Sequence, residues 1–314
     1  MVFRAVSLLP SHHTFAKTRI DGGLETIAVC FDQTGVSCRT KEESNPMETV
    51  TSNDSTTIAF DRLGDGPPVI VVGGQLCDRA LTRPTAEELA KRFTVFNYDR
   101  RGRGDSGDTA PYALEREVED IGALIAEAGR TASVYAHSSG AAFALRAAAA
   151  GLPIAKLVLH EPPYNPEGDE YRQHATRKEA EHIRTLLAED RRDDALEYFW
   201  RSIGMPQEMV DEMRQTPRWA QLEAMAPTMA YDSEVMGDVG RGGTIPADVA
   251  GAATTPTLVL SGGASPAWMI DVGRQLAVAL PDGRHEVLED QEHVVPPEVL
   301  VPVLEDFFSD STGS

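Results

Sequence analysis

Cysteine and long apolar runs are scarce in this chain, and each shortage excludes a class of protein. Three cysteines in 314 residues, Cys30, Cys38 and Cys77, form no C-x-x-C pair and match no metal-binding spacing. We therefore expect no metal site and a reduced, cytoplasmic setting, with a Cys30–Cys38 disulfide as the open alternative. No apolar run approaches the roughly 20 residues of a membrane helix. The apolar patch at 5–10 is too short for a secretory signal.

Positive charge is also in short supply. The chain has 29 Lys and Arg residues against 49 Asp and Glu residues, which gives a net charge of −20. Such a chain repels polyanions, so we expect neither nucleic acid nor an anionic membrane as a partner. The hydrophobic content of 41% is enough for one large domain with an insertion, and it leaves the oligomeric state open.

The pattern of elements divides the chain into an arm, a core in two parts, a cap and a tail. Residues 1–46 show no sustained period and predict a poorly ordered arm. Strands alternate with helices over 47–163 and again over 251–308, which predicts an α/β core with a doubly wound, mostly parallel sheet. Residues 164–250 break this alternation and predict an inserted helical cap. The polar tail is 309–314.

Consecutive helices are expected within the insertion, over 172–189, 194–202, 206–215 and 219–224. Tryptophan, tyrosine and methionine are dense there. Most of these side chains form the cap's own core in our interpretation, and some line an apolar pocket. We assign Trp200, Trp219, Tyr231 and Trp268 to this pocket, which suits a small apolar or aromatic carbonyl substrate.

One short stretch organises the chain. Residues 133–136 are β-prone and 139–150 are rich in alanine and helix-prone, with Ser138 between them. Small residues stand two positions to either side, Ala136 and Gly140. A strand that turns at once into a helix needs small residues at these places, and it pushes the corner side chain outward in a strained conformation. This pattern predicts that Ser138 is a nucleophile.

A serine hydroxyl needs a base and donors for the oxyanion. The candidate base is His293, which follows the last expected strand and precedes the closing helix. The candidate oxyanion donors are the main-chain amides of Ser139 and Gln75, the latter presented by the turn at Gly73 and Gly74. His137 flanks the nucleophile and is expected to support the turn.

Residues 47–308 resemble the α/β-hydrolase superfamily. The resemblance is carried, in chain order, by Val71-Val72-Gly73-Gly74, residues 98–106, Ala136-His137-Ser138-Ser139-Gly140, residues 256–260 and His293. It implies a serine nucleophile at Ser138, a histidine base at His293, a cap over the pocket and no cofactor. One departure is that the usual His-Gly of the oxyanion loop is Gly73-Gly74 here.

The acid is the larger departure. Most members of the family carry an aspartate after the strand that matches 257–260, and this position falls at about Ser265. Glu161 directly follows the expected strand next to the nucleophile and is the substitute, an arrangement similar to zearalenone-type lactone hydrolases. The alternative is that Glu161 only caps the hinge into the cap. Asp271 and Asp232 are weaker rivals, because neither follows a strand.

The charged loop 99–107 does not have phosphate-loop spacing, and we interpret it as a structural turn whose arginines pair with nearby carboxylates. The sequence therefore predicts a cofactor-free serine hydrolase that cleaves an ester or a lactone through an acyl-enzyme. Hydrolysis of a C–C bond and perhydrolase chemistry stay open with the same residues. A non-catalytic small-molecule binder stays open because of the missing acid at Ser265. Epoxide hydrolases and dehalogenases resemble this pattern less, because they carry aspartate at the turn.

Overall fold

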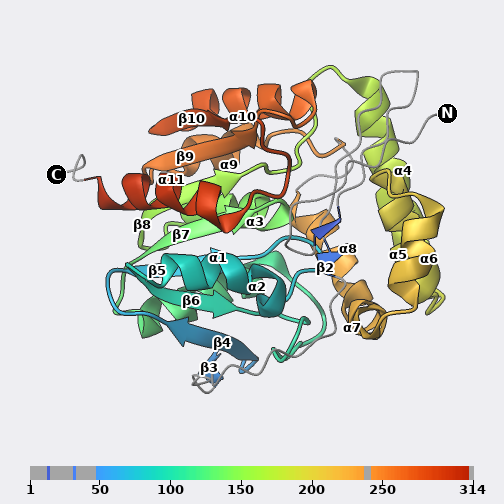
Figure 1. The fold of residues 1–314 in the computed structure, drawn as a ribbon, viewed down its shortest axis with the longest axis horizontal. Helices are drawn as coiled ribbons and strands as arrows, with labels where there is room; N and C mark the ends of the chain where they lie inside the picture. The colour runs from blue at the N-terminus through green and yellow to red at the C-terminus, as the bar shows by residue number, and fades with distance from the viewer. Residues whose placement is uncertain (1–12, 15–30, 33–46, 237–241, 311–314) are drawn as a thin grey trace.

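The protein is built on one large β-sheet with helices on both faces (Figure 1). The computed structural model describes residues 13–14, 31–32, 47–236 and 242–310. The large sheet has eight strands in the order β10-β9-β8-β7-β5-β6-β4-β3. All neighbours from β10 to β6 are parallel, and β4 and β3 add an antiparallel edge. The strands are Glu48–Thr51 (β3), Thr57–Leu63 (β4), Pro68–Val72 (β5), Thr94–Tyr98 (β6), Ala132–His137 (β7), Ile154–His160 (β8), Thr257–Gly262 (β9) and Gly283–Leu288 (β10).

Within the N-terminal 46 residues, the structure describes one short antiparallel pair, β1 (His13–Thr14) with β2 (Phe31–Asp32). The sequence pattern did not predict this pairing. The rest of the predicted arm, the Cys30–Cys38 alternative and most of the predicted tail (311–314) lie outside the described residues. Cys77 is a free thiol.

Side chains of the central strands alternate between two apolar clusters, as a sheet buried on both faces requires. In β5, Val69 and Val71 pack with α1 and α11, while Ile70 and Val72 pack with α2 and α3 on the other face. The core helices are Arg79–Leu89 (α1), Leu114–Glu127 (α2), Ser139–Ala149 (α3), Ala247–Ala252 (α9), Ala267–Ala279 (α10) and Pro297–Ser309 (α11). This architecture confirms the predicted doubly wound α/β fold.

The inserted helices form a separate layer, seen to the right of the sheet in Figure 1. They are Glu170–Ala188 (α4), Arg192–Ser202 (α5), Gln207–Arg214 (α6), Pro217–Met225 (α7), the 3-10 turn Ala226–Thr228 (η1) and Met229–Val235 (α8). They enclose their own apolar cluster. Helix α9, the end of the predicted cap, packs on α3 instead, and Ala250 belongs to the core cluster. Within the described ranges, no helix combines the length and the apolar character needed to cross a bilayer.

Parallel strands bring their carboxyl ends to one edge of the sheet, where ligands of such folds bind. The segments that follow β5, β7, β8 and β10 begin at Gly73, Ser138, Glu161 and Glu289. The fold therefore places Ser138 and Glu161 at the same edge as the loops that carry Gln75 and His293.

Candidate active site

Ser138 occupies the corner between β7 and α3. Its φ is 57° and its ψ is −129°, a sparsely populated conformation for a residue with a side chain. The turn is crossed closely by the chain after β5. A Cβ at Gly140 would lie 2.5 Å from the Gly73 carbonyl oxygen, and one at Gly74 would lie 2.9 Å from the Ser138 Cβ. Only glycine fits at these two positions, and the strained corner is held in place by its neighbours.

The two candidate oxyanion amides lie on either side of this crossing. Ser139 is the first residue of α3, so its N–H has no acceptor within the helix. Gln75 follows Gly74, in a turn closed by the Cys77 N–H donating to the Gly74 carbonyl at 3.4 Å. Neither the Gln75 nor the Ser139 amide donates to an acceptor in the part of the chain that the structure describes. Both are therefore available to a developing oxyanion.

Glu161 and His293 form a direct hydrogen bond. The Nδ1–H of His293 donates to Oε2 of Glu161 at 2.6 Å. Glu161 directly follows β8 with a φ of 46°, and its second oxygen, Oε1, accepts the Gly262 main-chain N–H at 2.7 Å. The Glu161 side chain is fully buried, and that of His293 is 11% exposed. Both carboxylate oxygens are thus fixed, and one of them orients the imidazole ring.

The Glu161 carboxyl is ionised at neutral pH. Burial acts to raise its pKa, but the hydrogen bond from His293 and the charge of that ring outweigh burial, so the pKa lies below its ordinary value. A buried carboxylate of this kind can hold a histidine in one tautomer and stabilise the imidazolium that forms during proton transfer.

His293 contacts His137, the residue that precedes Ser138. The Nε2–H of His137 donates to the His293 carbonyl oxygen at 2.9 Å, and the two ring centroids are 4.5 Å apart. No hydrogen bond joins the Ser138 Oγ to the His293 ring within the described residues. In hydrolases this bond often tightens only when substrate binds.

A third histidine ring, His160, packs against His137 with centroids 4.9 Å apart and the ring planes tilted by 52°. The pKa of His160 is lowered to about 4 by burial and by His293, against the attraction of Glu161. Burial, together with the neighbouring His293 and His160, holds the pKa of His137 well below its ordinary value. Both rings are neutral at pH 7. The sequence pattern indicates only a general supporting role for His137 and does not mark His160, since no local pattern indicates which side chains of neighbouring strands touch.

The other three positions considered for the acid, Ser265, Asp271 and Asp232, lie in different surroundings from Glu161. Ser265 is buried beside Glu161 and adds the weakest of the contributions that lower the pKa of Glu161, although its hydroxyl forms no complete hydrogen bond within the described residues. Asp271 pairs with Arg274 on the surface of α10. Asp232 is buried and pairs with arginines of the core. Neither aspartate contacts His293.

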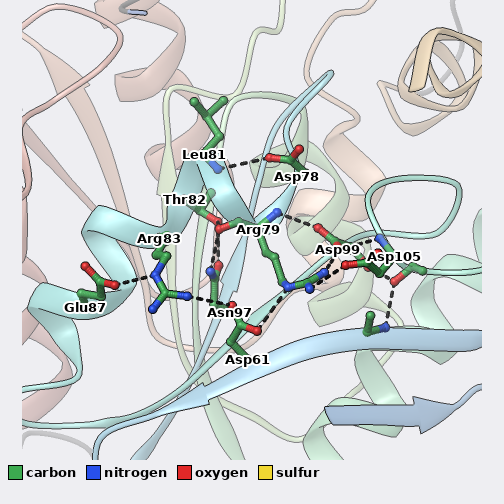
Figure 2. Close-up of polar contacts among 12 residues, drawn as sticks. Asp61, Asp78, Arg79, Leu81, Thr82, Arg83, Glu87, Asn97, Asp99 and Asp105 are labelled. Atoms are coloured by element: carbon green, nitrogen blue, oxygen red, sulfur yellow. Dashed lines mark hydrogen bonds and ion pairs between the residues drawn. The ribbon is translucent and has the colours of Figure 1, made fainter. Parts of the chain in front are cut away.

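The arginines of the loop 99–107 form buried ion pairs, as the sequence predicts. Arg100 pairs with Glu117 and Asp232, and Arg101 pairs with Asp54 and Asp120. The acidic residues of the same loop hold the start of α1. Figure 2 shows Asp99 accepting the Arg79 main-chain N–H, and Arg79 reaching Asp61, Asp99 and Asp105. Because α1 follows the turn at Gly74 and Gln75, this network anchors the candidate oxyanion loop.

The four aromatic side chains assigned to the pocket lie in three places. Trp200 and Trp219 are buried in the cap's own apolar cluster, and the Trp219 indole N–H donates to Asp193 at 2.8 Å. Tyr231 stacks on Tyr112 and donates to Asp108. Trp268 lies at the start of α10, with the Arg172 guanidinium of the cap 4.2 Å from its ring centre. The structure does not bring these four together, and their contact with substrate stays a prediction.

Known proteins share this fold and much of this sequence. A model of the alpha/beta hydrolase family matches residues 69–298. This chain belongs to the alpha/beta hydrolase family. An alpha/beta hydrolase from Sphaerobacter thermophilus DSM 20745 is 48% identical, with a TM-score of 0.72 over 83% of this chain and 100% of that one.

Two further relatives carry named activities. N-formylmaleamate deformylase of Pseudomonas putida KT2440 is 37% identical over 109 residues, which are 33% of this chain and 41% of the deformylase. The match thus spans less than half of that relative. The enol-lactonase from Burkholderia xenovorans LB400 is 21% identical, with a TM-score of 0.57 over 84% of this chain and 100% of that one, and it shows the shared fold alone.

Proposed function

We propose that this protein is a serine hydrolase that cleaves a carboxylic ester or a lactone through an acyl-enzyme. The observation that carries this proposal is the 2.6 Å hydrogen bond between His293 Nδ1 and Glu161 Oε2. It supplies a carboxylate for the proposed base His293, although the usual position of the acid is occupied by Ser265. The bond lies within the range that an acid–base pair needs.

The first half of the reaction forms the acyl-enzyme. The Ser138 Oγ attacks the substrate carbonyl carbon while the Nε2 of His293 takes its proton. The oxyanion accepts hydrogen bonds from the Ser139 and Gln75 amides. When the tetrahedral intermediate collapses, the C–O bond breaks and His293 gives the proton to the leaving oxygen. In a lactone that oxygen stays attached to the acyl group, which becomes a hydroxyacyl ester of Ser138.

The second half repeats these steps with water. His293 takes a proton from a water molecule that attacks the acyl carbon, and the intermediate releases the acid while His293 returns the proton to Ser138. Glu161 stays ionised and keeps the imidazole oriented throughout. No step needs a metal, and the described part of the chain holds no group of three or more His, Cys, Asp or Glu side chains suited to one.

An N-formyl compound is the second candidate substrate. The 37% identity to N-formylmaleamate deformylase over 109 residues favours it, and the same residues could hydrolyse a formamide carbonyl. C–C bond hydrolysis and the non-catalytic binder are further outcomes that one substrate panel separates, and perhydrolase chemistry is separated by repeating the ester assay with hydrogen peroxide.

The panel consists of p-nitrophenyl acetate, a δ-lactone, an N-formyl amide and an aryl β-diketone, assayed with wild type, Ser138→Ala and Ser309→Ala. Ser309 is an exposed serine at the end of α11 and serves as the matched control. We expect saturable hydrolysis of the ester or lactone, a loss of about 10⁴-fold or more in Ser138→Ala, and no change in Ser309→Ala. Full activity in Ser138→Ala would disprove the mechanism. Release of formate alone would favour the second candidate, and no turnover of any compound would favour the binder.

A further inference from the structure

The residue after the nucleophile is tied to the cap by its side chain. Asp232 lies on α8 of the cap, is 1% exposed, and accepts a hydrogen bond from the Ser139 hydroxyl at 3.0 Å. The same oxygen, Oδ1, accepts from Arg100 at 2.8 Å, and Oδ2 accepts from Arg103 at 2.7 Å. A single cap carboxylate therefore connects the loop 99–107 to the first residue of α3.

We propose that Asp232 is a positioning residue for the oxyanion hole, because it fixes Ser139 and thereby aims the Ser139 main-chain N–H. The inference rests on the proposed function, in which that amide receives the oxyanion. It adds that the oxyanion hole is fully aligned only when α8 is seated on the core.

Charge makes this contact directional. Burial acts to raise the pKa of Asp232, but the attraction of Arg103 and Arg100 and the hydrogen bonds from Arg100 and Ser139 outweigh it, so the carboxyl is ionised. An ionised carboxylate only accepts, so the Ser139 hydroxyl must be the donor. Its proton is committed to the cap, and the rotation of the side chain about Cα–Cβ is fixed.

The arginines hold Asp232 in place from the core side. The Arg100 Nε–H donates to Glu117 at 2.5 Å, and its guanidinium lies 5.1 Å from the Phe143 ring centre on α3. Arg103 also donates to Thr228 of the cap at 3.2 Å. Because both arginines are buried, moving α8 away would leave their charges without this partner. The seat of α8 and the direction of the Ser139 amide are thus coupled through Asp232.

Ser139→Ala tests the coupling without disturbing the ion pairs, since both arginine contacts of Asp232 remain. Asp232→Asn tests it from the cap side. The control is Arg146→Met, which removes another tie between α3 and α8, the Arg146 Nε–H bond to the Val235 carbonyl at 2.7 Å, and leaves Ser139 untouched. If Asp232→Asn does not fold, Ser139→Ala and the control carry the test.

The readouts are kcat, KM and inhibition by a trifluoromethyl ketone, whose hemiketal oxygen occupies the oxyanion hole. Removing an oxyanion donor outright costs about 10²–10³ in kcat, so misaligning one is expected to cost about tenfold. We expect Ser139→Ala and Asp232→Asn to lose this factor in both kcat and ketone affinity, with KM within about twofold. The double variant should lose no more than either single one, because both act through one contact.

A purely structural role predicts a different result. Values of kcat and ketone affinity within twofold of wild type in Ser139→Ala would overturn this inference while Ser138-dependent turnover leaves the proposed function standing. An equal loss in Arg146→Met would also overturn it, because general loosening of the cap would then suffice. If turnover does not depend on Ser138 at all, the proposed function fails and this inference fails with it.

Discussion

Two buried carboxylates contact the candidate site, Glu161 through His293 and Asp232 through Ser139, and their surroundings differ. Glu161 and Asp232 are 2% and 1% exposed, and both have a lowered pKa. Asp232 faces two arginines, so its charge is balanced permanently. Among the described residues, the ion contact of Glu161 is with His293, a side chain that is charged only when protonated.

This difference distinguishes the carboxylate that we propose aligns the oxyanion hole from the one that we propose orients His293. Burial alone does not distinguish the two, because both residues are equally withdrawn from water. A carboxylate that is already paired with two arginines adds little stabilisation to a positive charge that forms nearby. One whose partner is a histidine base stabilises the imidazolium that forms when the base takes a proton, and in the proposed mechanism this stabilisation acts on the transition state, where it accelerates the reaction.

Between the two carboxylates, the larger effect on activity is expected from Glu161→Gln. The amide keeps the shape of the side chain but cannot stabilise the imidazolium or enforce the tautomer of His293, so kcat/KM should fall by about 10³–10⁴. Steady-state kinetics on the best ester or lactone measure this. Asp232→Asn should lose only about tenfold in the same assay. Equal losses in the two variants would erase the distinction between the two carboxylates.

The largest effect on stability is expected at Asp232, from loss of its partner Arg100 in the variant Arg100→Met. This change leaves Asp232 and Glu117 short of a buried partner, and it should cost about 3–5 kcal/mol in the free energy of unfolding. Urea unfolding gives the value, and Arg274→Met is the control, since its pair with Asp271 is exposed and should leave the midpoint unchanged. A midpoint for Arg100→Met equal to that of the control would show that the buried network is dispensable.

A smaller effect is expected on the pH dependence of the free energy of unfolding, through the buried ring of His160. The pKa of His160 falls from 6.5 in the unfolded chain to about 4 in the folded protein. The unfolded state therefore binds more protons between these values. The stability due to neutral His160 is present above pH 6.5 and is lost as the pH falls toward 4, by at most about 3 kcal/mol.

The variant His160→Asn removes this titration. Urea unfolding at a series of pH values from 7 to 4 should therefore show a shallower loss of stability than in wild type. His137 and Glu161 remain in both proteins and titrate with the same sign, so the difference between the two curves reports His160 together with the small part of the other two pKa shifts that its charge causes. Parallel curves would mean that His160 does not titrate as its burial requires.

The smallest effect is expected from Ser265→Ala. The hydroxyl makes only the weakest of the contributions that lower the pKa of Glu161, so kcat/KM should stay within about twofold of wild type. A combined Glu161→Gln, Ser265→Asp variant tests the same point. Recovery of activity in this variant would show that Glu161→Gln loses activity because a carboxylate is missing and not because the shape of the side chain has changed. A large loss in Ser265→Ala would instead assign that residue a direct role.

Local signals in the sequence were sufficient for the strands, the turn at Ser138 and the order of the cap helices, because each depends on neighbouring residues. The helix predicted over 172–189 is found at Glu170–Ala188. The proximity of Glu161 and His293 was also predictable, since both follow parallel strands and such strands end at one edge.

Contacts between the cap and the core were not predictable. Ser139 and Asp232 are 93 positions apart, and nothing in either local sequence indicates that α8 lies over α3. The aromatic residues of the cap were ambiguous for a different reason, since the interior of a helical layer and an apolar pocket favour the same side chains. Trp219 lies in the cap's interior cluster, in line with the prediction that most of these side chains form the cap's own core.

The most direct test of the account is covalent labelling with a fluorophosphonate, followed by intact mass over time, for wild type, Ser138→Ala and Glu161→Gln. We expect one adduct on wild type, none on Ser138→Ala, and an adduct on Glu161→Gln that forms many times more slowly. An adduct that persists in Ser138→Ala, or a Glu161→Gln protein that is labelled as fast as wild type, would contradict the triad of Ser138, His293 and Glu161.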